Sequence, residues 1–157
     1  MLEKRASRTG ANDLHTIYRP YRVDEVLGHK TNMAQIKTGL DSGTLPHANL
    51  FIGDAGCGKT TAARIIALGL NCLEHSEATS TPCLKCESCS SILNYNSIDV
   101  IEVNVAQAGN KADIDSIARD LPGAPFTSRY KVIIFDEAHK LSDAAQALLL
   151  KVIEDGY

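Results

Sequence analysis

One stretch of the chain has glycines, a lysine and a threonine at the spacing of a phosphate-binding loop. Residues 53–60 read GDAGCGKT, which satisfies the pattern G-x-x-x-x-G-K-[ST] in full. The glycines let backbone N–H groups turn toward phosphate oxygens, and a helix that follows adds its positive N-terminal end. A merely solvated lysine in a glycine-rich turn is disfavoured, because an apolar stretch precedes the loop and a helical pattern follows it. We therefore predict nucleotide contacts from nine residues: Gly53, Asp54, Ala55, Gly56, Cys57, Gly58, Lys59, Thr60 and Thr61.

Two acids follow a short apolar run later in the chain, in the sequence VIIFDEAH. Open α/β sheets bind ligands at the carboxyl ends of their strands, which is where these acids would lie. With the phosphate loop upstream, Lys59 would reach the β- and γ-phosphates, and Thr60 and Asp136 would hold Mg²⁺. Glu137 would polarise the attacking water, which makes Lys59 and Glu137 the predicted catalytic residues. The alternative is a solvated acidic turn, and His139 belongs either to the motif or to the surface.

Four of the five cysteines, Cys72, Cys83, Cys86 and Cys89, fall within eighteen residues, and the last three form two overlapping C-x-x-C steps. Short knuckles of this kind bring four thiolates to one tetrahedral Zn²⁺. An iron–sulfur cluster is the main rival, but serines rather than a Cys-Pro pair follow Cys89. A redox pair would need a strand-to-helix junction. The sequence predicts a structural zinc site, with Cys57 in the phosphate loop left out of it.

The composition limits what else the chain can be. It has 157 residues, of which 44% are hydrophobic, enough for one domain with a core. The formal net charge of −3 provides no electrostatic footprint for nucleic acid. There is neither an apolar run of signal-peptide length nor a stretch long enough to cross a membrane. We therefore expect a cytoplasmic protein, in a compartment where disulfides are rare.

Periodicity predicts elements that alternate between strand and helix, which indicates an α/β fold with a mostly parallel sheet. Residues 1–13 are expected to be a mobile tail, and residues 71–91 a polar excursion without periodic structure. Apolar residues at helical spacing predict a helix that carries Met33 and ends near Gly43, and Ser142 can cap a final helix. The other expected elements are strands at 47–53, at 98–105 and in the apolar part of 131–139, and helices at 59–70 and 111–120.

Several of these motifs together resemble the N-terminal ATPase domain of the gamma/tau subunits of the bacterial DNA polymerase III clamp loader. The phosphate loop, the Asp-Glu pair and a four-cysteine excursion between them carry the resemblance. Further matches to that family are Tyr18-Arg19-Pro20, His47-Ala48-Asn49-Leu50-Phe51, Asn71-Cys72, Pro82 to Cys89, Ala124-Pro125, Tyr130-Lys131-Val132 and Leu141-Ser142.

The resemblance implies a P-loop NTPase of the AAA+ type, with a parallel sheet flanked by helices and a zinc-binding insertion. It implies work in a five-membered ring with other clamp-loader subunits, which uses ATP to place a sliding clamp on primed DNA. It also implies that Tyr18, Arg19, Val26 and Leu27 line the adenine pocket. The family's sheet order is 5-1-4-3-2, so residues 14–157 would form a partial AAA+ domain, with the C-terminal strands, arginine finger and lid beyond Tyr157. The chain alone is then expected to hydrolyse ATP poorly.

Two other functions remain open from the sequence. Asp136-Glu137-Ala138-His139 also spells the acid box of a helicase, which would require a second RecA-like domain. A non-enzymatic module that holds ATP without turning it over is the other alternative. ATP turnover measured with and without primed DNA and clamp separates all three.

Overall fold

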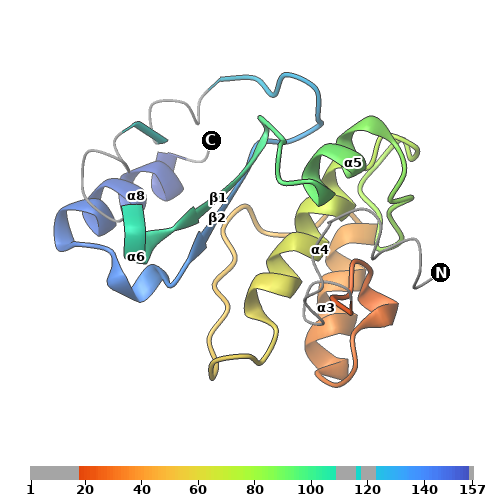
Figure 1. Cartoon of the computed structure of the whole chain (residues 1–157), viewed down its shortest axis with the longest axis horizontal. Helices are drawn as coiled ribbons and strands as arrows, with labels where there is room; N and C mark the ends of the chain where they lie inside the picture. The colour runs from red at the N-terminus through yellow and green to blue at the C-terminus, as the bar shows by residue number, and fades with distance from the viewer. Residues whose placement is uncertain (1–17, 109–115, 118–122, 156–157) are drawn as a thin grey trace.

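Helices lie on both sides of a two-stranded parallel sheet in the computed structural model, which describes residues 18–108, 116–117 and 123–155. Strand β1 (Val100–Asn104) pairs with strand β2 (Val132–Asp136). Val100 lies opposite Val132 and Asn104 opposite Asp136, so the two carboxyl ends are level. The α/β prediction and the strands expected at 98–105 and in the apolar part of 131–139 are confirmed. Figure 1 shows the sheet between α8 on one side and α3, α4 and α5 on the other.

The helices predicted on either side of the phosphate loop are confirmed as α3 (Lys30–Asp41) and α4 (Lys59–Asn71). Helix α3 ends as its sequence indicates, because Gly43 takes a positive φ of 65° and the N–H of Thr44 donates to the carbonyl of Gly39. The two helices bury one core between them, together with a short 3-10 turn, η1 (Val23–Glu25). The buried members of this core are Val23, Ile36, Leu40, Ala62, Ile65 and Ile66.

The predicted strand at 47–53 is absent, which corrects the expectation from sequence. The segment pairs with no strand among the described residues, and Leu50 and Ile52 are 78% and 86% exposed. A strand needs a neighbour to take its backbone hydrogen bonds and a layer to cover its side chains. Apolar composition alone supplies neither, so these residues run into the phosphate loop without becoming part of the sheet.

The cysteine-rich excursion contains a helix that the sequence analysis missed, α5 (Glu87–Leu93). Cys86 caps the N-terminus of α5, because its sulfur accepts a hydrogen bond from the N–H of Cys89, and Glu87 lies in the first turn. Its buried residue Ile92 packs with Leu68 of α4. The helix is stable in this position because it shares the apolar surface of α4, as expected for a segment too polar to form its own core.

The C-terminal part of the described chain packs on the other side of the sheet. Strand β2 leads into a 3-10 turn, η2 (Ala138–Lys140), and then helix α8 (Asp143–Asp155). The hydroxyl of Ser142 accepts a hydrogen bond from the N–H of Ala145, which confirms the predicted cap. A short helix not predicted from sequence, α6 (Val105–Ala108), follows β1, and Val105 packs with Leu141 and Ala145.

Two predicted segments lie wholly or mostly outside the described residues. The tail at 1–13 lies outside the described residues, and so does most of the helix expected at 111–120, of which only residues 116–117 are described and helical. None of the helices within the described part of the chain is both long enough and apolar enough to cross a membrane.

Candidate functional site

The predicted phosphate loop, residues 53–60, joins the unpaired segment before it to the N-terminus of α4, and it forms the bend at the lower end of that helix in Figure 1. Gly56 and Gly58 have φ angles of 78° and 97°, and Gly58 is the residue at which α4 begins. An L-residue pays about 1–2 kcal/mol in this left-handed region, so the pattern's glycines correspond to a backbone requirement here. Residues 53–56 are exposed, which leaves the loop open to a ligand.

The side chain of Lys59 folds back over the loop. Its ammonium donates to the carbonyl oxygens of Gly53 at 3.0 Å and Asp54 at 2.7 Å. The cation is therefore held beside the first turn of α4, where N–H groups lack helical partners and the helix dipole is positive. This is an arrangement that favours a phosphate, which would draw the ammonium from neutral carbonyls to a charged oxygen.

The loop is directly connected to the end of strand β2. The hydroxyl of Thr60 donates to a carboxylate oxygen of Asp136 at 3.3 Å, and the other carboxylate oxygen of Asp136 accepts the N–H of Glu137 at 3.0 Å. The structure thus brings together the two residues predicted to hold Mg²⁺. Hydroxyl and carboxylate oxygens are the ligands that this cation prefers.

Glu137 stands at the turn after Asp136 in an unusual backbone conformation. Its φ of 55° is in the left-handed region, which costs a non-glycine residue on the order of 1 kcal/mol or more. Its carboxylate forms an ion pair with Lys140, and that interaction lowers the pKa of Glu137 below its ordinary value. The side chain is solvent-exposed and ionised at neutral pH, as a residue that polarises water must be.

Asp136 also borders a cavity of about 310 Å³ between α4 and the sheet. Arg64 of α4 holds the carboxylate of Glu102 with two hydrogen bonds of 2.8 and 2.7 Å and donates to the hydroxyl of Tyr95 at 2.7 Å. The guanidinium also lies 4.7 Å from the centre of the Tyr95 ring. This network was not predicted, because an acid that alternates with apolar residues in a strand equally fits a solvent-facing position.

The four cysteines predicted to bind zinc lie together. Their sulfur atoms are all within 4.8 Å of one another, and none forms a disulfide. Cys72 directly follows α4 and Cys89 lies in α5, and both are fully buried. Cys83 and Cys86 lie in the segment that connects the two helices. With Zn–S bonds of about 2.3 Å, tetrahedral geometry requires sulfur separations of roughly 3.8 Å. Sulfur atoms within 4.8 Å of one another lie close to that spacing.

Backbone N–H groups point at the sulfurs in the way that stabilises thiolates. Cys83 donates to the sulfur of Cys72 at 3.3 Å, and Lys85 and Cys86 donate to that of Cys83 at 3.4 and 3.3 Å. Although burial opposes its ionisation, hydrogen bonds from neighbouring N–H groups lower the pKa of the Cys86 thiol to about 7. Burial raises the pKa of Cys89. Four thiolates so close together need a cation, so the donor set suits a metal ion.

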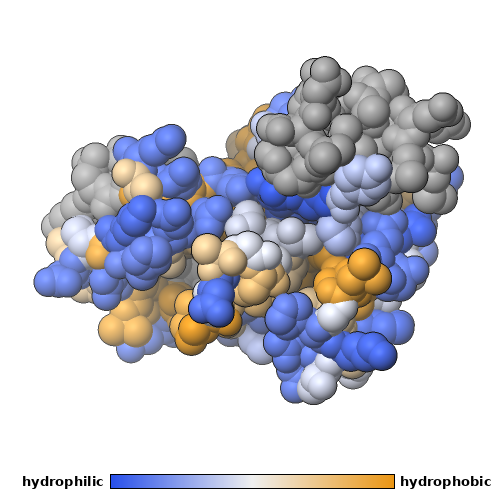
Figure 2. All heavy atoms as spheres, turned by 60° about the horizontal axis from the view of Figure 1, so that its bottom comes forward, coloured by the Kyte–Doolittle hydropathy of each residue, from blue (hydrophilic) through white to orange (hydrophobic). Residues whose placement is uncertain are grey.

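The residues expected to line the adenine pocket do not form a common buried surface. Val26 packs against the core of α3 and α4, but Leu27 is 95% exposed and Tyr18 is 61% exposed. One guanidinium nitrogen of Arg19 is buried without a hydrogen-bond partner among the described residues. The adenine pocket therefore stays a prediction. Figure 2, which brings the loop end of the molecule forward, shows apolar patches interrupting a largely polar surface there.

Comparison with known proteins identifies relatives along almost the whole chain. A family model described as "DNA polymerase III, delta subunit" matches residues 28–156. The gamma/tau subunit of DNA polymerase III from Mycobacterium tuberculosis is 42% identical over 144 residues, which is 90% of this chain and 25% of that protein. The tau subunit from Bacillus subtilis is 37% identical over 142 residues, again 90% and 25%. The tau subunit from Escherichia coli is 36% identical over 138 residues, 88% of this chain and 21% of that protein.

The chain therefore spans about a quarter of the length of the curated relatives that it matches. The matched residues of the family model include the phosphate loop, the four cysteines and the Asp136-Glu137 pair, whereas Tyr18, Arg19, Val26 and Leu27 precede its first matched residue.

Proposed function

We propose that this chain, which belongs to the family described as "DNA polymerase III, delta subunit" and is similar to gamma/tau subunits, binds and hydrolyses ATP as a motor subunit of a DNA-replication clamp loader. The observation that carries the proposal is the contact between Thr60 and Asp136. It joins the phosphate loop to the acidic end of β2, as hydrolysis of a nucleoside triphosphate with Mg²⁺ requires.

Each residue has a role that follows from its position. The backbone N–H groups of the loop and the first turn of α4 would receive the phosphate oxygens, and Lys59 would move from the carbonyls of Gly53 and Asp54 to the β- and γ-phosphates. Thr60 and Asp136 would hold Mg²⁺, which neutralises charge that develops on the phosphates. Glu137 would orient a water for in-line attack on the γ-phosphorus, with ADP as the leaving group and phosphate as the second product.

We assign the four cysteines to a structural Zn²⁺. Four thiolates leave no coordination position for water or substrate, so the ion would contribute folding energy rather than catalysis. The segment that carries the cysteines packs on α4 through Leu68 and Ile92 and has no core of its own. Metal binding would therefore fix this segment to the helix that begins at the phosphate loop.

The proposed assembly follows from the resemblance of the motifs to the clamp-loader family, and the relatives' names support only membership of DNA polymerase III. We propose a five-membered ring with other clamp-loader subunits, which places a sliding clamp on primed DNA. The net charge of −3 gives this chain no overall electrostatic attraction to DNA, so contact with primed DNA would come through the assembly.

The decisive experiment measures ATP turnover of the chain reconstituted with its partner subunits, with and without sliding clamp and primed DNA. The proposal predicts turnover that rises when both are present. Turnover stimulated by single-stranded DNA without the clamp would instead favour a helicase. Binding of a fluorescent ATP analogue without turnover under any of these conditions would indicate a nucleotide-holding module.

A further inference from the structure

The end of α4 and the segment before β2 hold each other through two side chains. The side-chain oxygen of Asn71 accepts the N–H groups of Arg129 at 3.1 Å and Tyr130 at 2.7 Å. In return, the guanidinium of Arg129 donates to the carbonyls of Leu70 at 3.0 Å and Cys72 at 3.3 Å, the residues on either side of Asn71. We call this reciprocal arrangement the Asn71–Arg129 bridge.

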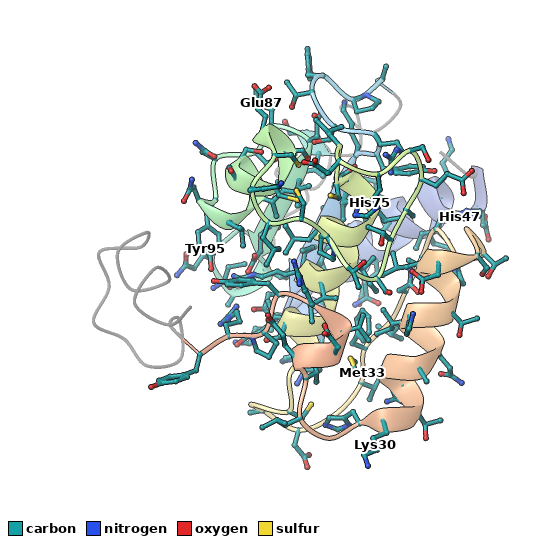
Figure 3. All side chains as sticks on the ribbon, turned by 90° about the vertical axis from the view of Figure 1, so that its right-hand side faces the viewer. Lys30, Met33, His47, His75, Glu87 and Tyr95 are labelled. Carbon is teal, nitrogen blue, oxygen red and sulfur yellow. The ribbon has the colours of Figure 1, made fainter. Side chains whose placement is uncertain are left out.

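The Asn71–Arg129 bridge supplies hydrogen-bond donors to backbone carbonyls that the end of a helix leaves without partners. The last carbonyls of α4 have no helical donor, and they carry the negative end of the helix dipole. The guanidinium supplies several donors and a positive charge at that point, and it also donates to the carbonyl of His75 at 2.6 Å. Figure 3 shows His75 on the loop beyond α4, so Arg129 spans the backbone on both sides of Cys72.

Arg129 is presented by a segment that is itself fixed. The buried carboxylate of Asp99 accepts the N–H groups of Phe126, Thr127 and Ser128 at 2.7 to 2.8 Å. The hydroxyl of Ser128 also lies 3.0 Å from that of Ser88 in α5. The residues just before Arg129 are therefore anchored to β1 and to the helix that carries Cys89.

We propose that Arg129 and Asn71 are positioning residues for the metal site, which set its affinity by fixing the backbone at Cys72. The inference rests on the proposed zinc binding. Asn71 is completely buried and directly precedes this ligand. A Zn²⁺ ion with four thiolates carries a net charge of −2, and the Arg129 guanidinium contacts the backbone of one of the four ligands. Removal of a group that orients a metal ligand without binding the metal itself typically weakens metal affinity by about 10–100-fold.

The test compares zinc affinity by competition with a chromogenic chelator in the whole chain and in three variants. Arg129→Gln should bind zinc about 10–100-fold more weakly. Arg129→Lys should also weaken it at least several-fold, because an ammonium cannot span three separate carbonyls as the guanidinium does. Lys151→Gln removes a charge of the same sign on the exposed surface of α8 and should match the wild type. If Arg129→Gln does not fold, Arg129→Lys alone decides the question.

A spectroscopic measurement separates positioning from general stability. The Co²⁺-loaded wild type should show the intense visible bands of a tetrahedral thiolate site, and Arg129→Gln and Arg129→Lys should show shifted or weaker bands at metal saturation. Wild-type affinity and spectra in both Arg129 variants would overturn the inference. Failure of the wild type itself to bind zinc would overturn the proposed metal site instead, so the two failures are distinguishable.

Discussion

The hydroxyl of Thr60 donates a hydrogen bond to the carboxylate of Asp136 across 76 residues of sequence. This contact places the first turn of α4 against the end of β2, and it connects the two motifs that the sequence predicts to share a magnesium ion. The phosphates and the water that attacks them would therefore meet on one edge of the sheet.

Replacing Lys59 should abolish nucleotide binding. In Lys59→Ala the loop loses the cation that now lies on the carbonyls of Gly53 and Asp54 and would move to the phosphates. Titration of a fluorescent ATP analogue with Mg²⁺ should show affinity reduced at least about 100-fold, as expected for a charge-assisted contact worth about 3 kcal/mol. Lys151→Ala, on the exposed surface of α8, is the matched control. Equal affinity in the two variants would contradict the assignment.

Replacing Glu137 should separate binding from hydrolysis. Glu137→Gln keeps the size of the side chain but removes the charge that polarises water, and it leaves the loop intact. In the reconstituted assembly we expect unchanged ATP affinity and a kcat lower by about 100-fold or more, the usual contribution of a general base. Glu154→Gln, exposed on α8, serves as the control. Normal turnover by Glu137→Gln would show that another group activates the water.

One zinc ion per chain should be bound, and its removal should destabilise the chain. Metal analysis of protein made in zinc-replete medium should give about one equivalent, because four thiolates complete a tetrahedral site. A chelator, or Cys83→Ser, should lower the melting temperature, since binding energy is also folding energy. Cys57→Ser lies outside the cluster and should keep the metal. A folded sample without zinc, or one with iron–sulfur absorbance, would refute this prediction.

Asp99 should make the free energy of unfolding depend on acidic pH. Although burial opposes its ionisation, three backbone N–H groups lower the pKa of Asp99 to about 2, from an ordinary value of 3.8. Because the folded pKa is lower than the unfolded one, the stabilisation is complete above about pH 4 and is lost as the pH falls toward 2. Urea denaturation should show a loss on the order of 2 kcal/mol over this range.

The Asp99→Asn variant provides the control for that measurement. It should be destabilised at neutral pH and should lose this part of the acid dependence, whereas Asp24→Asn on the exposed turn η1 should behave like the wild type. An unchanged acid dependence in Asp99→Asn would assign the effect to other carboxylates.

The exposed apolar residues before the phosphate loop should promote self-association. Leu50 and Ile52 lie outside the sheet with most of their surface in water. The double variant Leu50→Ser and Ile52→Thr should reduce light scattering of the purified chain on warming, because the apolar area available for association decreases. Its melting temperature should change little. Polar substitution of the half-buried Phe51, which packs against the core of α3 and α4, should lower the melting temperature instead.

The sequence predicts the chemistry of the site because the residues that would carry it lie close together along the chain. The loop residues Gly56, Gly58 and Lys59 act within a few positions of one another, and so do Cys83, Cys86 and Cys89. The cap at Ser142 and the end of α3 at Gly43 were predictable for the same reason. Even the missed helix α5 left a local trace, since Cys89, Ile92 and Leu93 have helical spacing once cysteine is counted as apolar.

Tertiary structure alone decided the features that depend on distant partners. Whether 47–53 becomes a strand depends on a neighbour to accept its hydrogen bonds, and its own composition does not contain that information. The Asn71–Arg129 bridge joins two residues 58 positions apart, and a lone arginine or asparagine in a sequence gives no sign of such a partner. Local patterns specify which groups can do chemistry. The packing of α4 against β1, β2 and the cysteine segment specifies which of those groups meet, because these contacts form only when segments remote in sequence fold together.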